Sequence, residues 1–429
     1  MSLVTLVGMA PLIGALLLIL LPSKNTELIK RSALIITLLI AAFSVLLATR
    51  FDRDIEQFQF TQSNSWISAF NVNFAVGIDG ISLVLILLST FLVPIVILAT
   101  WHESDSGRWS TKVFYILILL LETLMIGVFA ATDLFLFYVF FEAMLVPIYF
   151  LIGGYGSGNK SAAAVKFLLY SLFGGLLMLA SVIGLYIISG NQTGATFDLG
   201  QLATLQIDNR TEYFLFLGFF IAFAIKAPLW PFHTWLPDAA KSATPGTSVL
   251  LLGVLDKVGT YGMIRFCIQL FPDATKTFTP LIITLAVISI IYGAFMAIGQ
   301  RDIKGLIAFT SISHFGFITM GIFAMTSQGM SGASLYMVNH GFSTAALFLI
   351  AGWMIWRRGS STISDFGGLQ RVTPVMAWGF FIAGMSSLAL PGLPSFVSEF
   401  LVLVGTFFHF LFFVFFFSFF HFVFIFSFT

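Results

Sequence analysis

Twelve stretches of this chain are apolar for long enough to cross a membrane as a helix, which takes about 20 predominantly apolar residues. The stretches lie near residues 3–22, 32–50, 80–100, 113–132, 134–153, 164–189, 213–235, 247–270, 278–299, 303–325, 331–356 and 375–404. Of all 429 residues, 59% are hydrophobic and only 9% are charged, which excludes a soluble globular domain. We therefore expect an all-α, polytopic membrane protein, because helices satisfy their own backbone hydrogen bonds in lipid.

Charge balance and cysteine content narrow the range of functions. The 20 basic residues nearly offset the 19 acidic residues, so nothing indicates a nucleic-acid partner. Cys267 is the single cysteine of the sequence, so a disulfide or a cysteine-ligated iron–sulfur cluster cannot form within the chain. Residues 1–21 have no basic region and no small-residue cleavage site, so we interpret them as a membrane helix.

The loops differ in their content of lysine and arginine. Thirteen of these residues lie in loops that follow odd-numbered spans, and five lie in loops or helix ends that follow even-numbered spans. Because positively charged loops stay in the cytoplasm or matrix, we expect the N-terminus to lie outside. The longest polar interruptions, 51–79 and 190–212, are expected to form hairpins or short helices outside the bilayer.

Ionisable side chains stand inside several of the expected spans. They are Glu142, Lys226, Lys257, His314 and His340. Glu142 interrupts the apolar run FYVFFEAMLVPIYF, where a charge is costly unless it is paired, hydrated or protonated. A lysine can also extend to the interface or pair with a neighbouring acid, as Lys257 could with Asp256. The set as a whole favours an ion path through the membrane.

Proline and glycine interrupt two of the spans beside ionisable residues. Lys226 precedes Pro228 and Pro231, and Glu399 follows the segment PGLP at 391–394. Such breaks free backbone carbonyl groups and are tolerated where they line a hydrated cavity. The interrupted spans are the seventh and the twelfth, so the two lie in opposite orientations, as in transporters built from inverted repeats.

Several motifs resemble those of one known family. They are DGISLVLILLSTFLVPI, DLFLFYVFFEAMLVPIYFLIG, FAIKAPLWPFHTWLPDAA, SISHFGF, VNHGFSTAALF and LPGLPSFVSEFL. Together they resemble the antiporter-like membrane subunits of respiratory complex I, the proton-pumping NADH:quinone oxidoreductase. The acid in FVSEF resembles the chain M type, whose mitochondrial counterpart is chain 4, whereas the sister chains L and N typically have lysine there.

The resemblance implies a division of the chain, which it covers from about residue 5 to 406. Residues 1–111 would hold helices 1–3, residues 112–271 a first inverted five-helix repeat (helices 4–8), and residues 276–406 most of a second repeat (helices 9–13). Helices 7 and 12 would be discontinuous. The family has fourteen helices.

The resemblance also implies roles in proton translocation. Glu142 and Lys226 match the glutamate and lysine of the first half-channel, and Lys257 matches a bridging lysine in helix 8. His314 and His340 match the histidines of helices 10 and 11, and Glu399 matches the terminal acid. An approaching carboxylate favours a charged lysine and a departing one favours proton release, so Glu142 could control Lys226.

The resemblance further implies partners, cofactors and location. No cofactor is expected in this chain, and NADH, flavin, iron–sulfur clusters and quinone are expected in partner subunits. The partners would be other membrane-arm subunits, especially the sister chains L and N, within the lipid bilayer. The location would be a bacterial inner membrane, or the mitochondrial inner membrane if the chain is organellar. The alternative is a subunit of a multisubunit cation/proton antiporter without redox coupling.

Three features outside the path have separate interpretations. Glu122, also intramembrane, is compatible with a supporting role beside the path or with a hydrogen bond between helices. Asp79 is expected to cap the third helix. Residues 407–429 are unusually rich in phenylalanine and differ from the family, so we interpret them as a truncated or misread tail, the alternative being a genuine phenylalanine-rich span.

Overall fold

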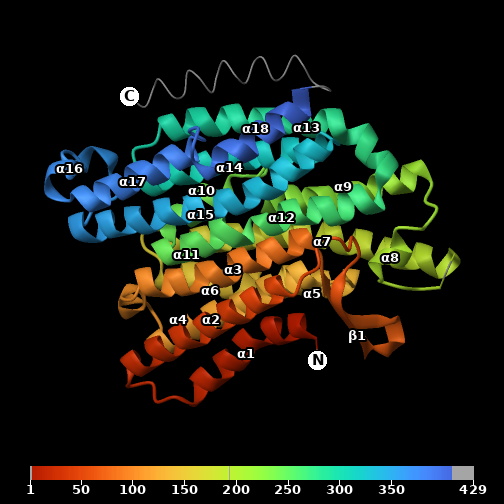
Figure 1. The fold of residues 1–429 in the computed structure, drawn as a ribbon, viewed down its shortest axis with the longest axis horizontal. Coiled ribbons are helices and arrows are strands. Elements are labelled where there is room, and N and C mark those ends of the chain that lie inside the picture. Colours follow the sequence, from red (N-terminus) through yellow and green to blue (C-terminus); the bar gives the residue numbers. More distant parts are fainter. Residues whose placement is uncertain (1, 193, 408–429) are drawn as a thin grey trace.

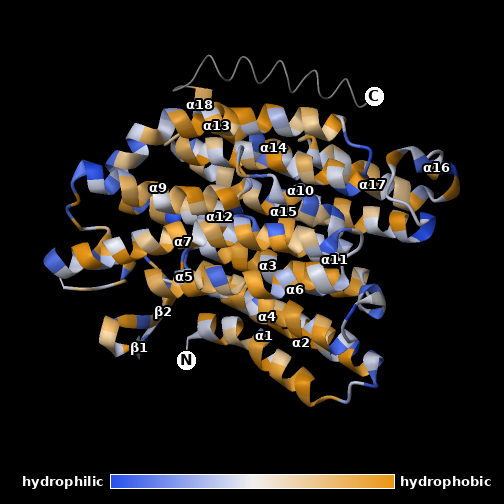
Figure 2. Cartoon of the chain, turned by 180° about the vertical axis from the view of Figure 1, so that it is seen from behind, coloured by the Kyte–Doolittle hydropathy of each residue, from blue (hydrophilic) through white to orange (hydrophobic). Residues whose placement is uncertain are grey.

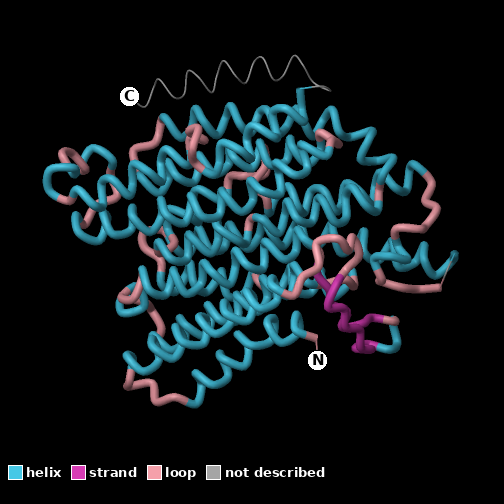
Figure 3. Tube along the Cα trace, in the orientation of Figure 1, coloured by secondary structure: helices cyan, strands magenta, loops and turns pink. Residues whose placement is uncertain are grey.

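A computed structural model describes residues 2–192 and 194–407, and helices make up most of this part of the chain (Figure 1, Figure 3). Ten helical segments among these residues are long and apolar enough to cross a membrane. Nine of them are α1 (Leu3–Leu20), α2 (Thr26–Thr49), α3 (Gly80–Ala99), α4 (Thr111–Ala130), α5 (Leu134–Ala143) with α6 (Leu145–Tyr155), α7 (Lys160–Gln192), α13 (Pro272–Ile298), α14 (Ile303–Phe323) and α15 (Ser327–Arg358). The all-α membrane fold is confirmed.

The tenth segment, Pro245–Ile268, changes its helical type along its length. It consists of α11 (Pro245–Leu250), the π-helical turn η3 (Leu251–Leu255), α12 (Lys257–Gly262) and a second π-helical turn, η4 (Met263–Ile268). Each π turn bonds i to i+5, so it changes the direction in which the following side chains point. This segment carries Lys257.

The two remaining expected spans, 213–235 and 375–404, are broken into shorter helices. The first consists of α9 (Asn209–Lys226) and α10 (Trp235–Ser242), and the second of α17 (Pro374–Ser387) and α18 (Pro394–Phe407). Lys226 is the last residue of α9, and Pro228 and Pro231 lie in the linker. Because proline lacks a backbone N–H, the carbonyl groups before it need other donors, and the Trp235 indole donates to the Ile225 carbonyl at 2.9 Å.

The expected polar loops form compact structures. Strands β1 (Gln59–Ile67) and β2 (Val72–Ile78) pair antiparallel across the 3-10 turn η1 (Ser68–Phe70), and α8 (Leu199–Leu202) lies in the second loop. Asp79 caps α3 by accepting a hydrogen bond from the Ser82 amide at 2.9 Å, as expected. Short elements elsewhere are η2 (Glu103–Ser106), η5 (Ile363–Asp365) and α16 (Leu369–Val372).

The helices lie side by side, and the loops gather at the two ends of the bundle (Figure 1). The β1–β2 hairpin and α8 lie at one end and α16 lies at the other, so the loops alternate between the ends as the expected topology requires. Hydrophilic residues concentrate at these ends, and hydrophobic residues predominate along the helices between them (Figure 2). Residues 408–429 of the phenylalanine-rich tail, which the sequence suggests is truncated or misread, lie outside the described residues.

Candidate functional site

Glu142 and Lys226 meet where two helices end. Glu142 lies in the last turn of α5, and its carboxylate rests against Gly175 of α7, where a Cβ atom would overlap Glu142 Oε1. Lys226 Nζ lies 4.7 Å from the ring centroid of Phe141 and 5.8 Å from that of Phe167. The carboxylate and the ammonium interact electrostatically. In the described part of the structure, Lys226 Nζ is buried and donates no hydrogen bond, so this interaction and the aromatic rings stabilise its charge.

Lys257 and His340 form a direct contact between helices. Lys257 Nζ lies 2.7 Å from His340 Nδ1 of α15, and it also donates to the Leu252 carbonyl in the π turn η3. His340 Nε2 lies 3.0 Å from the Ser311 hydroxyl of α14. When Lys257 is charged it must donate, so His340 Nδ1 accepts and Nε2 carries the hydrogen that Ser311 receives. The pair is thus able to exchange a proton directly.

His314 and Tyr336 continue the row toward Glu399. The His314 ring centroid lies 5.3 Å from that of His340 and 5.6 Å from that of Tyr336. The Tyr336 hydroxyl of α15 interacts with the buried Glu399 carboxyl of α18. The break before α18 is held by Asn339, whose side-chain amide donates to the Pro394 carbonyl at 2.9 Å.

The structure therefore brings all six residues selected from the sequence into one row. The row begins at Glu142 and Lys226 and continues through Lys257, His340 and His314 to Glu399. The row thus runs from the N-terminal side of the bundle, at α5, to its C-terminal side, at α18 (Figure 1). The other helices that carry it are α9, α12, α15 and α14. Charged and tautomeric groups spaced in this way can pass protons from group to group with hydration.

Sequence reasoning missed three members of this row. Tyr336 was missed because a tyrosine in an apolar span is usually packing, and Ser311 because serine is common inside membrane helices. Asp256 was considered only as a neighbour of Lys257, yet it is fully buried and interacts electrostatically with both Lys226 and Lys257. Its charge inside the span was the signal that could have identified it.

Glu122 does not join the row. It is fully buried in α4, and neither carboxyl oxygen has a hydrogen-bond partner within residues 2–192 and 194–407. Among the described residues, no charged group is found to interact with it electrostatically. The hydrogen bond between helices that the sequence left open is therefore not formed among the described residues.

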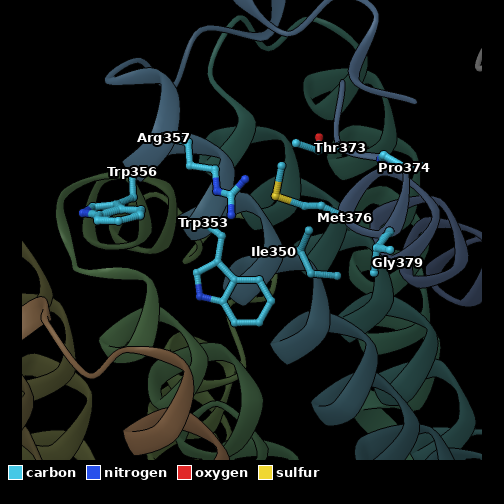
Figure 4. Close-up of a pocket in the computed structure, with 9 residues that line it drawn as sticks. Ile350, Trp353, Trp356, Arg357, Thr373, Pro374, Met376 and Gly379 are labelled. Atoms are coloured by element: carbon cyan, nitrogen blue, oxygen red, sulfur yellow. The ribbon is translucent and has the colours of Figure 1, made fainter. Parts of the chain in front are cut away.

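Among the described residues, the row does not form a metal site. Over the described ranges, no three His, Cys, Asp or Glu side chains cluster in a way that could hold a metal ion. A groove of about 740 Å³ lies between the end of α15 and the start of α17, where the Arg357 side chain lies between Trp356 and Met376 (Figure 4). None of the six row residues lines this groove.

Broken helices with buried charges at their breaks define an antiporter-like membrane subunit, and comparisons with known proteins agree. Residues 131–425 match the transmembrane family of NADH:quinone oxidoreductase and Mrp antiporters. Residues 9–128 match the amino terminus of NADH-ubiquinone oxidoreductase chain 4. These two matches cover most of the chain.

Similar proteins specify the type. NADH-quinone oxidoreductase subunit M of Mycobacterium tuberculosis is 50% identical over 432 residues, covering 93% of this chain and 78% of that protein. NADH-ubiquinone oxidoreductase chain 4 of Arabidopsis thaliana is 41% identical over 400 residues, covering 93% and 79%. A chain of respiratory complex I from Thermus thermophilus superposes with a TM-score of 0.87 at 32% identity, covering 96% of this chain and 84% of that chain.

This chain belongs to the family of NADH-quinone oxidoreductase subunit M and mitochondrial chain 4, the antiporter-like subunits of the complex I membrane arm. The Mrp complex of Dietzia superposes with a TM-score of 0.81 at 23% identity, covering 94% of this chain and 43% of that chain, which indicates a shared fold alone. The predicted family is confirmed, and the antiporter without redox coupling is the less favoured alternative.

Proposed function

We propose that this subunit carries protons across the membrane without redox chemistry of its own. The observation that supports the proposal is the row of ionisable groups from the half-buried Glu142 to the buried Glu399, in which Asp256 links Lys226 with Lys257 electrostatically. A scaffold has no need of such a row, because each buried charge costs free energy unless it is compensated. The driving force would come from electron transfer between NADH and quinone in partner subunits.

Glu142 and Lys226 form the loading site in this proposal. While the carboxylate is close, it favours the charged lysine, and when it withdraws, the proton on Lys226 is released toward Lys257. Lys226 is suited to such a change because it is the last residue of α9, beside the proline-containing break, whereas Glu142 lies in the last turn of α5, before the junction of α5 with α6. These groups titrate together, so the step belongs to the pair.

His340 and His314 would transfer the proton to the Glu399 end. Neutral imidazole has one donor and one acceptor nitrogen, so each ring can receive a proton on one side and give it up on the other. Glu399, at the α18 break and in contact with Tyr336, would receive the proton and release it outward. Residues 112–271 and 276–406 are the two inverted repeats in this proposal, each with one broken helix.

The surroundings of the subunit follow from the same proposal. NADH, flavin, iron–sulfur clusters and quinone would be bound by partner subunits, and the sister chains L and N would be its neighbours. The complex I from Thermus thermophilus, which has bound NADH, supports partners of this class. We further propose that the N-terminus faces outward, with the loop of α16 on the cytoplasmic or matrix side.

Replacement of Lys226 by alanine tests the proposal. Lys226→Ala should lower NADH-driven proton uptake by inverted membrane vesicles, because the loading site of this subunit loses its proton carrier. Oxidation of NADH by an artificial acceptor should remain normal, since that reaction occurs elsewhere in the complex. Lys276→Ala is the matched control, because the Lys276 side chain is 76% exposed. Normal pumping by an assembled Lys226→Ala complex would refute the proposal.

A further inference from the structure

Asp256 occupies the junction between η3 and α12, inside the membrane. Asp256 is fully buried, and neither of its carboxyl oxygens has a hydrogen-bond partner in the described part of the chain. Its backbone amide donates to the Leu251 carbonyl at 3.1 Å, which closes the π-helical turn. An acid that is buried and lacks hydrogen bonds must be stabilised by charge or stay protonated.

Two cations supply that charge from two different helices. The Asp256 carboxylate interacts electrostatically with Lys257 of its own helix and with Lys226 of α9. The helices can approach because α12 has glycine at 259, where a Cβ atom would lie 2.6 Å from the Ala227 amide nitrogen. The carboxylate therefore connects the loading site at Lys226 with the central site at Lys257.

The other ionisable groups around this junction do not replace Asp256. His340 of α15 contacts Lys257 as a hydrogen-bond acceptor, and His314 of α14 lies beyond His340. Within the described part of the chain, Glu122 of α4 has no charged neighbour, and α3 and α11 carry no ionisable side chain. Glu142 interacts with Lys226. Without Asp256, the pair Lys226 and Lys257 would therefore share one carboxylate.

We propose that Asp256 is the second counter-ion of this buried lysine pair, which allows Lys226 and Lys257 to hold protons at the same time. With Glu142 and Asp256 ionised and both lysines charged, the four groups sum to zero net charge. Removal of Asp256 would leave one excess positive charge, which is expensive inside a membrane. Asp256 acts through the lysines, so it is a positioning residue, and its role rests on the proposed function of the subunit.

The pH profile of proton pumping tests this role. Asp256→Asn keeps the shape of the side chain but removes its charge, so the lysines bind protons less tightly. The part of the profile in which pumping declines with rising pH, its alkaline limb, should move to lower pH by about one unit. At a given pH on that limb, the pumping rate should be about tenfold below that of wild type. Asp256→Glu should restore the wild-type limb. Glu122→Gln, at an equally buried acid without a charged neighbour, should leave the profile unchanged.

A charge-balanced double variant tests the proposal if the complex with Asp256→Asn does not assemble. If an excess buried charge prevents assembly, the double variant Asp256→Asn with Lys257→Gln should restore it, because one carboxylate and one lysine remain. Failure of this double variant to restore assembly would overturn the proposal, as would a wild-type pH profile in assembled Asp256→Asn complex. Lys226→Ala, measured in parallel, separates the two ideas: normal pumping by that variant refutes the proposed function itself.

Discussion

At the residue scale, the site depends on small side chains as much as on charged ones. Gly175 leaves the volume that the Glu142 carboxylate occupies, and Gly259 lets α12 approach the backbone of α9. Neither glycine has a positive φ angle, so space and not backbone conformation explains both. The arrangement of the charged groups therefore also requires small residues that cannot themselves bind a proton.

Gly175→Ala should disturb the loading site, because the added methyl group would overlap Glu142 Oε1. Overpacking of this kind costs about 1–3 kcal/mol, and here displacement of the Glu142 side chain is the expected way to relieve it. Proton pumping per assembled complex should fall, while NADH oxidation by an artificial acceptor stays normal. Gly153→Ala is the control, since a Cβ atom at 153 meets its nearest neighbour at an ordinary 3.6 Å. Equal pumping by the two variants would show that Glu142 does not need its observed position.

At the element scale, the helix breaks were predictable and the π-helical turns were not. Prolines at 228, 231 and 391 indicated the ends of α9 and α17, because proline cannot continue the hydrogen-bond ladder. The segment Leu251–Leu255 has an ordinary helix-forming composition, so its i to i+5 bonding depends on packing between helices. For this reason the side-chain directions around Asp256 could not be derived from an ideal helix of 3.6 residues per turn.

Another element-scale contact lies outside the spans, where η2 meets the start of α11. The Gly246 amide donates to both carboxyl oxygens of Glu103, at 3.0 and 3.2 Å. Burial raises the pKa of Glu103 from 4.5 to about 7, although hydrogen bonds from Thr244 and Gly246 and the charge of Lys304 favour the ionised form. Because the folded-state pKa exceeds the unfolded value, this contribution to stability is complete below pH 4.5 and is lost as pH rises through about 7.

Glu103→Gln should therefore stabilise the protein at alkaline pH. Glutamine still accepts a hydrogen bond from Gly246 but never ionises, so the variant should unfold at an increasingly higher temperature than wild type as pH rises from about 4.5 to about 7, and the difference should stay constant above that pH. The measurement is the unfolding midpoint of the purified complex across that range. Glu56→Gln, at an exposed acid, should show no such trend. A difference between Glu103→Gln and wild type that does not depend on pH would contradict the assignment.

At the scale of the whole molecule, the sequence was sufficient to predict the membrane class and the family, and it identified six of the ionisable residues that the structure brings together. Apolar length and composition predicted the spans, and the motifs around Glu142, Lys226 and Glu399 indicated the family. The continuity of the row was not predictable, because Tyr336 and Ser311 join it only through packing between α14, α15 and α18. Contacts between helices distant in sequence arise from tertiary packing, which local patterns do not encode.

The orientation of the molecule is a separate whole-molecule prediction. In a background that lacks the buried Cys267, a single cysteine at Ser65 of the β1–β2 hairpin should react with an impermeant maleimide in right-side-out vesicles. A cysteine at Ser364 in η5, at the other end of the bundle, should react in inverted vesicles. Both positions are exposed, so access to the reagent is set by the membrane. The opposite labelling pattern would reverse the N-terminus-out topology.

The central claim is that one proton path connects the loading site to Glu399, and the number of protons pumped per electron tests it most directly. The ratio is measured in proteoliposomes for Lys226→Ala, Glu399→Gln and the double variant, each normalised to assembled complex. If both residues serve one path, the two single variants should lower the ratio equally and the double variant should lower it no further. A wild-type ratio in either single variant, or an additive loss in the double variant, would contradict a single path.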